Sequence, residues 1–360
     1  MQNKETNLNF SGQNFYIGID VHKKQWHVTI LGEQYEHKSM SQDSNSLVLS
    51  NYLARTFPGG VYHAVYEAGF SGFGICRELQ SFGINCKVVH PADVPTSDKE
   101  RKQKTDRSDS RKLAKILRDK DFEGIDVPER EVESYRALNR QRFRLVKDMS
   151  RVKNRLKSLL FQFGIEIPQR FNESSTRHWS KVYLDWLKNL LVEQDSLRRV
   201  LDNYLQQGEF LRKQILLVNK QIRELSHSDY FNQNVQLLLS IPGIGLITAM
   251  TILTELYDIK RFSTLDQLCN FVGLVPSMHN SGEREITGKI IKRGRKEIKI
   301  MLIEASWDAL RADQALMQKF NELSKRMNKN KAVIRIARKL LSRIRHVLIN
   351  KEVYQLGIIC

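Results

Sequence analysis

The chain has 360 residues, enough for two or three domains, and its 41% hydrophobic content is enough to build buried cores. Lys and Arg outnumber Asp and Glu by 58 to 40, which gives a formal charge of +18 at pH 7. This surplus favours a polyanionic partner such as nucleic acid, although a merely soluble basic protein is the simple alternative.

The cysteines and the N-terminus predict a cytoplasmic protein. The four cysteines include no CxxC pair and no histidine at zinc-site spacing, so we expect reduced thiols. The polar N-terminus lacks the apolar segment of a signal peptide. The stretch from Val235 to Thr254 is uncharged and long enough to suggest a membrane span, but Pro242, Gly243 and Gly245 interrupt it, which favours a buried helix-turn-helix.

The first 125 residues alternate strand and helix signals, and we interpret residues 1–125 as one α/β domain. Short apolar runs predict strands at Tyr16–Asp20, Trp26–Ile30, Val61–Tyr66 and Cys86–His90. Amphipathic segments predict helices at Asn45–Arg55, Gly72–Phe82 and Asp106–Asp119. The pattern indicates a sheet that begins with an antiparallel hairpin and continues with parallel strands.

Residues 126–228 are charged and strongly helical, and we expect an antiparallel coiled-coil arm, with an ordinary helical bundle as the alternative. The segment Gly164–Trp179, which contains Pro168, separates two long helices whose apolar residues follow the alternating 4-3 spacing of a/d seams. The seam of the first helix consists of Leu145, Met149, Val152, Leu156, Leu159 and Phe163. That of the second consists of Leu211, Ile215, Val218, Ile222 and Leu225.

Residues 229–360 predict a mainly helical C-terminal domain. Ile241-Pro-Gly-Ile-Gly245 is typical of a helix-hairpin-helix, in which glycines let backbone N–H groups approach a phosphate. A tight turn between core helices is the alternative. We expect a Gly- and Lys-rich loop from Ser277 to Gly294, followed by basic helices.

The last of these helices predicts a phosphate-binding face. Its apolar stripe consists of Ile334, Ala337, Leu341, Ile344 and Leu348. Nine cations and no acid fall between Lys325 and Arg345, namely positions 325, 326, 329, 331, 335, 338, 339, 343 and 345. We expect this charged side to contact nucleic acid, and a merely solvated surface is the alternative.

Four carboxylates predict a metal site. Asp20 ends the first strand, Glu67 follows the strand Val61–Tyr66, and Asp106 and Asp109 open a helix with i, i+3 spacing. Acids brought together from strand ends and a helix start suit two Mg²⁺ ions about 4 Å apart, which stabilise the oxygens of a phosphoryl transfer. Each acid alone has a simpler explanation, as a helix N-terminal charge or a turn residue.

Cations surround two of these acids. The sequence motifs alone do not decide whether a serine acts as a nucleophile. The crowding of Lys and Arg around Asp106 and Asp109 suits a phosphate backbone held against metal ions, and a solvated helix face is the simple alternative. The residues expected to contact nucleic acid are Lys104, Arg107, Arg111, Gly243, Gly245, Lys292, Arg293, Arg335 and Arg338. Ser281, beside Gly282, lies in a basic loop, but no histidine is obviously placed to activate it.

Taken together, these motifs resemble the transposases of the IS-one-ten family of insertion sequences. Gly18-Ile-Asp20, Tyr66-Glu67-Ala-Gly69 and Lys104-Thr-Asp106-Arg-Ser-Asp109 resemble the family's N-terminal DEDD domain. Pro242-Gly-Ile-Gly245, Gly273-Leu-Val-Pro276, Ser281-Gly282 and Gly288-Lys-Ile-Ile-Lys292-Arg-Gly294 resemble its C-terminal domain. The resemblance runs from about Tyr16 to about Tyr354.

The resemblance implies an RNase H-like (RuvC-like) N-terminal domain, a coiled-coil arm and a C-terminal catalytic-serine domain. It implies a homotetramer that joins donor and target DNA, guided by a structured RNA, at the nucleoid of a prokaryotic cell. By this resemblance Asp20, Glu67, Asp106 and Asp109 hold Mg²⁺ and Ser281 is the nucleophile.

The chain departs from the family pattern at two places. Asn280 stands where many members carry a first serine, which leaves Ser281 as the candidate. Ile290-Ile-Lys-Arg-Gly-Arg295 replaces an Ile-Thr-Lys-x-Gly-Asn string, which puts the loop's contacts to DNA or RNA in doubt. Site-specific invertases of the same architecture, a junction-resolving nuclease and a non-enzymatic nucleic-acid-binding protein are the rival interpretations.

Overall fold

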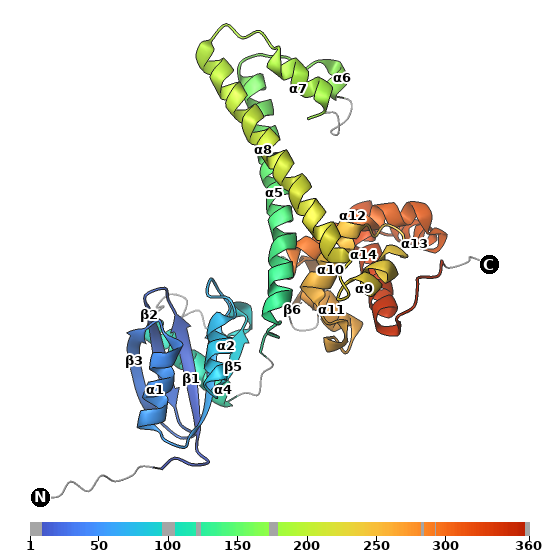
Figure 1. Cartoon of the computed structure of the whole chain (residues 1–360). Helices are drawn as coiled ribbons and strands as arrows, with labels where there is room; N and C mark the ends of the chain where they lie inside the picture. The colour runs from blue at the N-terminus through green and yellow to red at the C-terminus, as the bar shows by residue number, and fades with distance from the viewer. Residues whose placement is uncertain are drawn as a thin grey trace, which may run out of the picture. The chain divides into compact units, whose positions relative to one another are not determined.

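The computed structural model describes residues 9–95, 105–119, 124–172, 179–281, 284–291 and 293–356. The chain divides into two compact units, residues 1–127 and 128–360 (Figure 1). Each unit has its own elements and core, so each is treated by itself.

The first unit contains a mixed five-stranded sheet. Its strands are β1 (Asn14–Val21), β2 (Gln25–Leu31), β3 (Glu36–Asp43), β4 (Val61–Glu67) and β5 (Asn85–Val89), in the order β3-β2-β1-β4-β5. β1 pairs with β2, and β2 with β3, in antiparallel fashion, whereas β1–β4 and β4–β5 are parallel. The expected antiparallel start and parallel continuation are thus confirmed, and the four predicted strands are present.

Helices cover both faces of this sheet. α1 (Ser46–Thr56) and α2 (Gly74–Ser81) share a core with Ala64 and Tyr66, whereas α4 (Asp106–Asp119) shares one with Val65. Because successive strand residues point to opposite faces, α4 lies across the sheet from α1 and α2. Asn45 caps α1 by accepting hydrogen bonds from the backbone N–H groups of Leu47 and Val48, so the helix begins one residue after its predicted start.

β3 was not predicted. Its sequence, EHKSMSQD, is polar and only partly buried, so it lacks the alternation that identifies a strand. It is recognisable only through its pairing with β2 and through Arg111 of α4, whose guanidinium bonds both carboxylate oxygens of Glu36 at 2.7 and 2.8 Å.

α4 lies directly against β1 at Gly18. A Cβ at this position would lie 2.0 Å from the carbonyl oxygen of Ser110 and 2.4 Å from the backbone nitrogen of Ala114, so no larger residue fits. A buried hydrogen bond of 2.8 Å between the hydroxyls of Thr29 and Ser110 fixes the same turn of α4 to β2. The start of α4 is thereby held near the end of β1.

The second unit begins with a helical arm. α5 (Arg130–Gln162) and α8 (Asp195–Ser226) pack side by side in opposite directions, and α6 (Gln169–Asn172) and α7 (Lys181–Lys188) lie at the far end (Figure 1). The predicted seam is buried at Leu145, Met149, Val152 and Leu156. Beyond that point Leu160 replaces Leu159 as the fully buried residue, because a helix of 3.6 residues per turn drifts from a 3.5-residue repeat. Phe163 follows the end of α5 and is exposed.

The rest of the second unit is mainly helical, as expected. Its elements are α9 (Asn232–Leu239), α10 (Leu246–Leu256), α11 (Leu265–Val272), β6 (Pro276–Ser281), β7 (Arg284–Ile290), α12 (Lys296–Ala312), α13 (Gln314–Ser324) and α14 (Lys329–Asn350). The apolar stretch beginning at Val235 forms α9, a turn and α10, which confirms the helix-turn-helix. Among the described helices, none combines the length and the apolar character of a membrane span.

The expectation of a loop from Ser277 to Gly294 is wrong. β6 and β7 pair as an antiparallel two-stranded sheet, with Ser281 opposite Arg284. The strand residues are mostly polar, so their sequence resembles that of a loop, and cross-strand hydrogen bonding decides the outcome.

A buried glutamate joins the arm to the helices behind it. Glu255 of α10 is 1% exposed and bonds the guanidinium of Arg140 at 2.6 and 2.9 Å. Arg136 of α5 and Arg295, the N-cap of α12, approach the same carboxylate at 3.6 and 3.7 Å. Burial lowers the pKa of Arg136 to about 10, although the charge of Glu255 acts against this shift.

Replacing Gly18 by Ala should destabilise the first unit, because the new methyl group meets the backbone of α4. We expect the free energy of unfolding to fall by about 1–3 kcal/mol in urea denaturation, as for other overpacked sites. Gly74→Ala is the matched control, since a Cβ there has nothing within 4 Å. Equal stability of the two variants would contradict the packing argument.

Replacing Glu255 by Gln should leave three arginines without their buried counter-charge. We expect a loss of about 3–5 kcal/mol in the unfolding free energy of the second unit, measured by denaturant titration. Glu224→Gln removes an exposed carboxylate 3.8 Å from Lys220 and should change stability by less than about 0.5 kcal/mol. A small effect at Glu255 would show that the cluster does not hold the arm.

Candidate metal and nucleic-acid site

Two predicted acids lie near the ends of neighbouring parallel strands, Asp20 as the penultimate residue of β1 and Glu67 as the last residue of β4. Ile19 of β1 pairs with Tyr66 of β4, so the residues that follow, Asp20 and Glu67, lie side by side at the same edge of the sheet. Gly18 and Val65, two residues earlier, face α4, and strand alternation therefore directs Asp20 and Glu67 toward the α4 face.

The other two predicted acids open α4 on that face. Asp106 is its first residue, and Asp109 follows one turn later, with its backbone N–H donating to the carbonyl oxygen of Thr105. The close contact at Gly18 places this end of the helix beside the end of β1. All four acids thus belong to one edge of the first unit.

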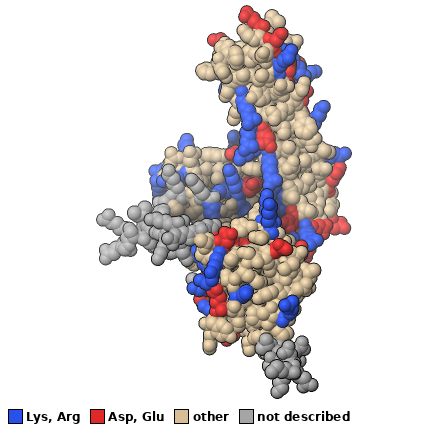
Figure 2. All heavy atoms as spheres, turned by 90° about the vertical axis from the view of Figure 1, so that its left-hand side faces the viewer, with Lys and Arg blue, Asp and Glu red and all other residues tan. Residues whose placement is uncertain are grey.

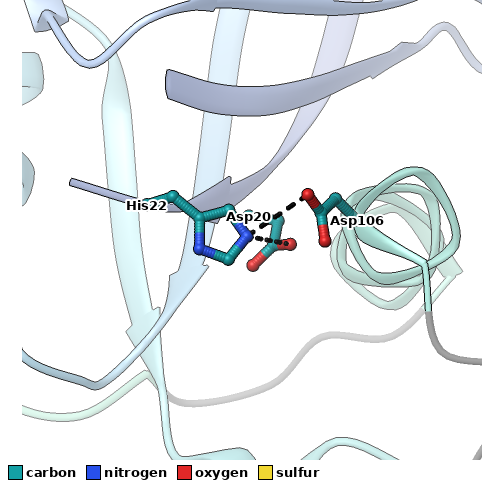
Figure 3. Close-up of side chains that lie close together, drawn as sticks. All are labelled: Asp20, His22 and Asp106. Carbon is teal, nitrogen blue, oxygen red and sulfur yellow. Dashed lines mark ion pairs between the residues drawn. The ribbon is translucent and has the colours of Figure 1, made fainter. Parts of the chain in front are cut away.

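A histidine lies between two of these acids. Nε2 of His22 lies 3.3 Å from Oδ2 of Asp20 and 3.4 Å from Oδ2 of Asp106 (Figure 3). Donor atoms of these three side chains all lie within 4.8 Å of one another. Asp20 is the least exposed of the three side chains, at 23%, compared with 53% for His22 and 64% for Asp106.

Sequence reasoning missed His22. It stands two residues after Asp20, and this i, i+2 spacing at a strand end is the signal that places the two side chains on one face. The spacing alone is common, and only the position of α4 gives it meaning.

The donor set fits a divalent cation. Carboxylate oxygens are the usual ligands of Mg²⁺ and Mn²⁺, and imidazole adds a nitrogen donor. Asp20 and Asp106 reach a common point without any movement of the backbone, and Glu67 and Asp109 lie at the same edge.

A basic cleft adjoins these side chains. It has a volume of about 440 Å³, extends from Asp106 and His22 across the β1–β2 turn and is lined by Lys23 and Lys24. His27 also lines the cleft and hydrogen-bonds the hydroxyls of Ser39 and Ser41 of β3, each at 3.1 Å. Cationic lining beside acidic residues suits a phosphate backbone held next to a metal ion.

The predicted basic frame of α4 has mixed roles. Arg107 is exposed, as a nucleic-acid contact requires. Arg111 instead makes its two short bonds to Glu36, and the hydrogen bond to that carboxylate raises the pKa of Arg111. Lys104 lies outside the described residues.

The two turn glycines between α9 and α10 also differ. Gly243 has a φ of +84°, and a Cβ there would lie 2.3 Å from the carbonyl oxygen of Ala305, so this glycine packs against α12. Gly245 is exposed and lines a cleft of about 260 Å³ together with Asn219 and Arg223 of α8. The exposed glycine is therefore the one that a phosphate can approach.

The predicted nucleophile lies in the second unit. Ser281 is the last residue of β6, and its side chain is outside the described part of the chain, as is Lys292. Arg293 is exposed beyond β7, and Gly294, at a φ of +107°, contacts the backbone of Gly273.

The cations of α14 divide into two groups. Arg338, Arg343 and Arg345 bond Asp266, Asp313 and the carbonyl oxygens of Phe262 and Ser263. Others, including Lys331, Arg335 and Lys339, are exposed. The predicted apolar stripe is buried except at Ile334, which is partly exposed.

Asp313 explains why Arg343 is held inside. Burial acts to raise the pKa of Asp313, but hydrogen bonds from Tyr354 and the backbone of Leu316, with the charge of Arg343, outweigh burial and hold the pKa below its ordinary value. The carboxylate therefore stays ionised beneath α14.

Basic side chains also follow the arm. Lys and Arg form a row along it on the face shown in Figure 2. The exposed cations of α5 and α8 include Arg144, Lys147, Arg155, Lys157, Arg212 and Lys213.

Two family models match the chain. A transposase model of the DEDD type matches residues 17–165, which contain the four acids. The model described as Transposase IS116/IS110/IS902 family matches residues 235–322, which contain the α9–α10 turn and the β6–β7 hairpin.

Curated transposases are similar over most of the chain. The transposase for insertion sequence element IS1533 of Leptospira borgpetersenii is 28% identical over 250 residues, 68% of this chain and 70% of that protein. The transposase for IS1111A of Coxiella burnetii is 27% identical, covering 78% of this chain and 76% of that protein. The transposase for IS1328 of Yersinia enterocolitica is 24% identical, covering 81% and 82%. With both domain models in order and relatives along most of its length, the chain belongs to the IS110 (IS-one-ten) family of insertion-sequence transposases.

Proposed function

We propose that this transposase cuts and rejoins DNA with Mg²⁺ held by Asp20, Glu67, Asp106 and Asp109, and with the hydroxyl of Ser281 as nucleophile. The main support for the proposal is that the carboxylates of Asp20 and Asp106 both lie close to Nε2 of His22. Glu67 lies at the same edge of the sheet. Acids from β1, β4 and α4 are far apart in the sequence and share one edge only in the fold.

The acids and the adjoining cleft have different roles in the proposed reaction. A bound divalent cation would polarise the phosphoryl oxygens and stabilise the attacking and leaving oxygens. Lys23 and Lys24 would hold the DNA backbone in the cleft beside Asp106, where it faces the carboxylates. The clustering of carboxylates is costly without a cation, which supports a metal-binding role.

The serine step is a transesterification. Oγ of Ser281 gives up its proton as it attacks the scissile phosphorus. The Oγ–P bond forms as the bond to the deoxyribose oxygen breaks, and that oxygen takes up a proton, so no net proton is gained or lost. The phosphoserine link conserves the ester, so a second DNA end can displace the serine and rejoin the strand. The position of Ser281 at the end of β6, between two glycine-bearing motifs of the matched domain, supports this role.

The partners follow from the family and the charge. We propose donor and target DNA as substrates, a structured guide RNA, and a homotetramer that acts at the nucleoid of a prokaryotic cell. An RNase H-like (RuvC-like) first domain, a coiled-coil arm and a helix-hairpin-helix at the α9–α10 turn belong to the same proposal. The net charge of +18, the row of cations on the arm and the exposed cations of α14 support nucleic acid as the partner.

A trapped protein–DNA adduct tests the chemistry. Ser281→Ala should abolish the adduct, and Asp20→Asn should reduce its formation at least about 100-fold, because a catalytic metal contributes several kcal/mol. Ser277→Ala, in the same strand, is the control and should form the adduct normally. Mass spectrometry that maps the adduct to another residue would remove Ser281 from the mechanism, and hydrolysed ends without any adduct would indicate a nuclease.

Neutralising the exposed side of α14 should weaken DNA and RNA binding uniformly across sequences. For Lys331→Gln, Arg335→Gln and Lys339→Gln together, we expect the slope of log affinity against log salt to fall by about one unit per lost phosphate contact. The control exchanges Lys and Arg at the same three positions and should keep the slope. An unchanged slope in the neutral variant would make this side a solvated surface.

A further inference from the structure

His22 gives the acid site a nitrogen donor. Its Nε2 lies 3.3 Å from Oδ2 of Asp20 and 3.4 Å from Oδ2 of Asp106 (Figure 3). Adjacent ligands of an octahedral ion with bonds of about 2.1 Å are about 3.0 Å apart, so the nitrogen lies within a few tenths of an ångström of ligand spacing from each oxygen.

The backbone holds His22 in this position. Val21 of β1 pairs with Trp26 of β2, and Trp26 is buried, so the connection that carries His22 is short and anchored on both sides. Asp20 is fixed in β1 and Asp106 by the packing of α4 on Gly18. A short turn anchored by β1 and β2, the strand β1 itself and the helix α4 thus bring the three donors together.

The nitrogen changes which ion the site prefers. Mg²⁺ selects oxygen ligands and gives up its water reluctantly, so imidazole adds little to its binding. Mn²⁺ accepts carboxylate oxygen and, as a first-row transition ion, gains affinity from imidazole nitrogen. We propose that His22 is a metal ligand and that it makes this site bind Mn²⁺ in preference to Mg²⁺.

This inference rests on the proposed function, since it concerns the same acids, but it is tested without DNA or catalysis. The full chain is titrated with Mn²⁺ alone and followed by electron paramagnetic resonance, and Mg²⁺ affinity is obtained by competition. Electron spin echo envelope modulation then reports whether ¹⁴N is bound to the Mn²⁺.

In the wild type, bound Mn²⁺ should show directly coordinated ¹⁴N and the higher affinity of the two ions. His22→Ala should remove the ¹⁴N signal and weaken Mn²⁺ binding about ten-fold or more, with Mg²⁺ affinity nearly unchanged. His22→Asp should create an all-oxygen site and shift the preference toward Mg²⁺. His27→Ala, a histidine of the same cleft, should leave the ¹⁴N signal in place.

A wild-type spectrum without ¹⁴N, or a signal that survives His22→Ala, would overturn the assignment. Asp20→Asn separates this failure from failure of the proposed function. If Asp20→Asn loses Mn²⁺ while His22→Ala binds like the wild type, only the role of His22 fails. If Asp20→Asn binds Mn²⁺ normally, or the wild type binds none, the acid site fails and this inference fails with it.

Discussion

The close packing of α4 on β1 at Gly18 is the constraint on which the candidate site depends. A hydrogen in place of a side chain lets the backbone of Ser110 and Ala114 lie against the strand, closer than any Cβ would allow. The acids of α4 gain their neighbours only through this contact, since they are more than 80 residues beyond Asp20 in the sequence. The Thr29–Ser110 hydrogen bond and the Arg111–Glu36 pair fix the rotation of the helix and keep its first turn at the strand edge. Gly18 and Asp20, which belong to the same sequence motif, therefore both contribute to the geometry of the candidate site.

The sequence predicted the parts of the fold that apolar periodicity determines. The four apolar strands and the three helices of the first unit were found because burial imposes a period of two or of 3.6 residues on them. β3 and the β6–β7 hairpin are not predicted from the sequence, because their residues are mostly polar. Pairing with another strand, rather than burial, makes them strands. The predicted seam of α5 matches the buried residues as far as Leu156. Beyond it the buried positions shift, because the 4-3 spacing assumes a strict heptad.

The sequence locates the acids of the candidate site but not the side chains that surround them. Asp20, Glu67, Asp106 and Asp109 stand at strand ends and a helix start, positions that sequence patterns locate well. His22 was missed because its meaning depends on a tertiary contact. The same limit applies to the cations: Arg111, Arg338 and Arg343 are indistinguishable from their exposed neighbours in sequence, yet each bonds a carboxylate of another element.

The buried carboxylate of Glu255 connects two parts of the second unit. It bonds Arg140 in the arm and lies near Arg295, which follows the β6–β7 hairpin by a few residues and donates its backbone N–H to the carbonyl oxygen of Phe271. Breaking such a buried charge cluster costs several kcal/mol. One carboxylate therefore ties the base of the arm to the segment that follows the hairpin. A change at Glu255 acts on both, although Arg140 and Arg295 are far apart in the sequence.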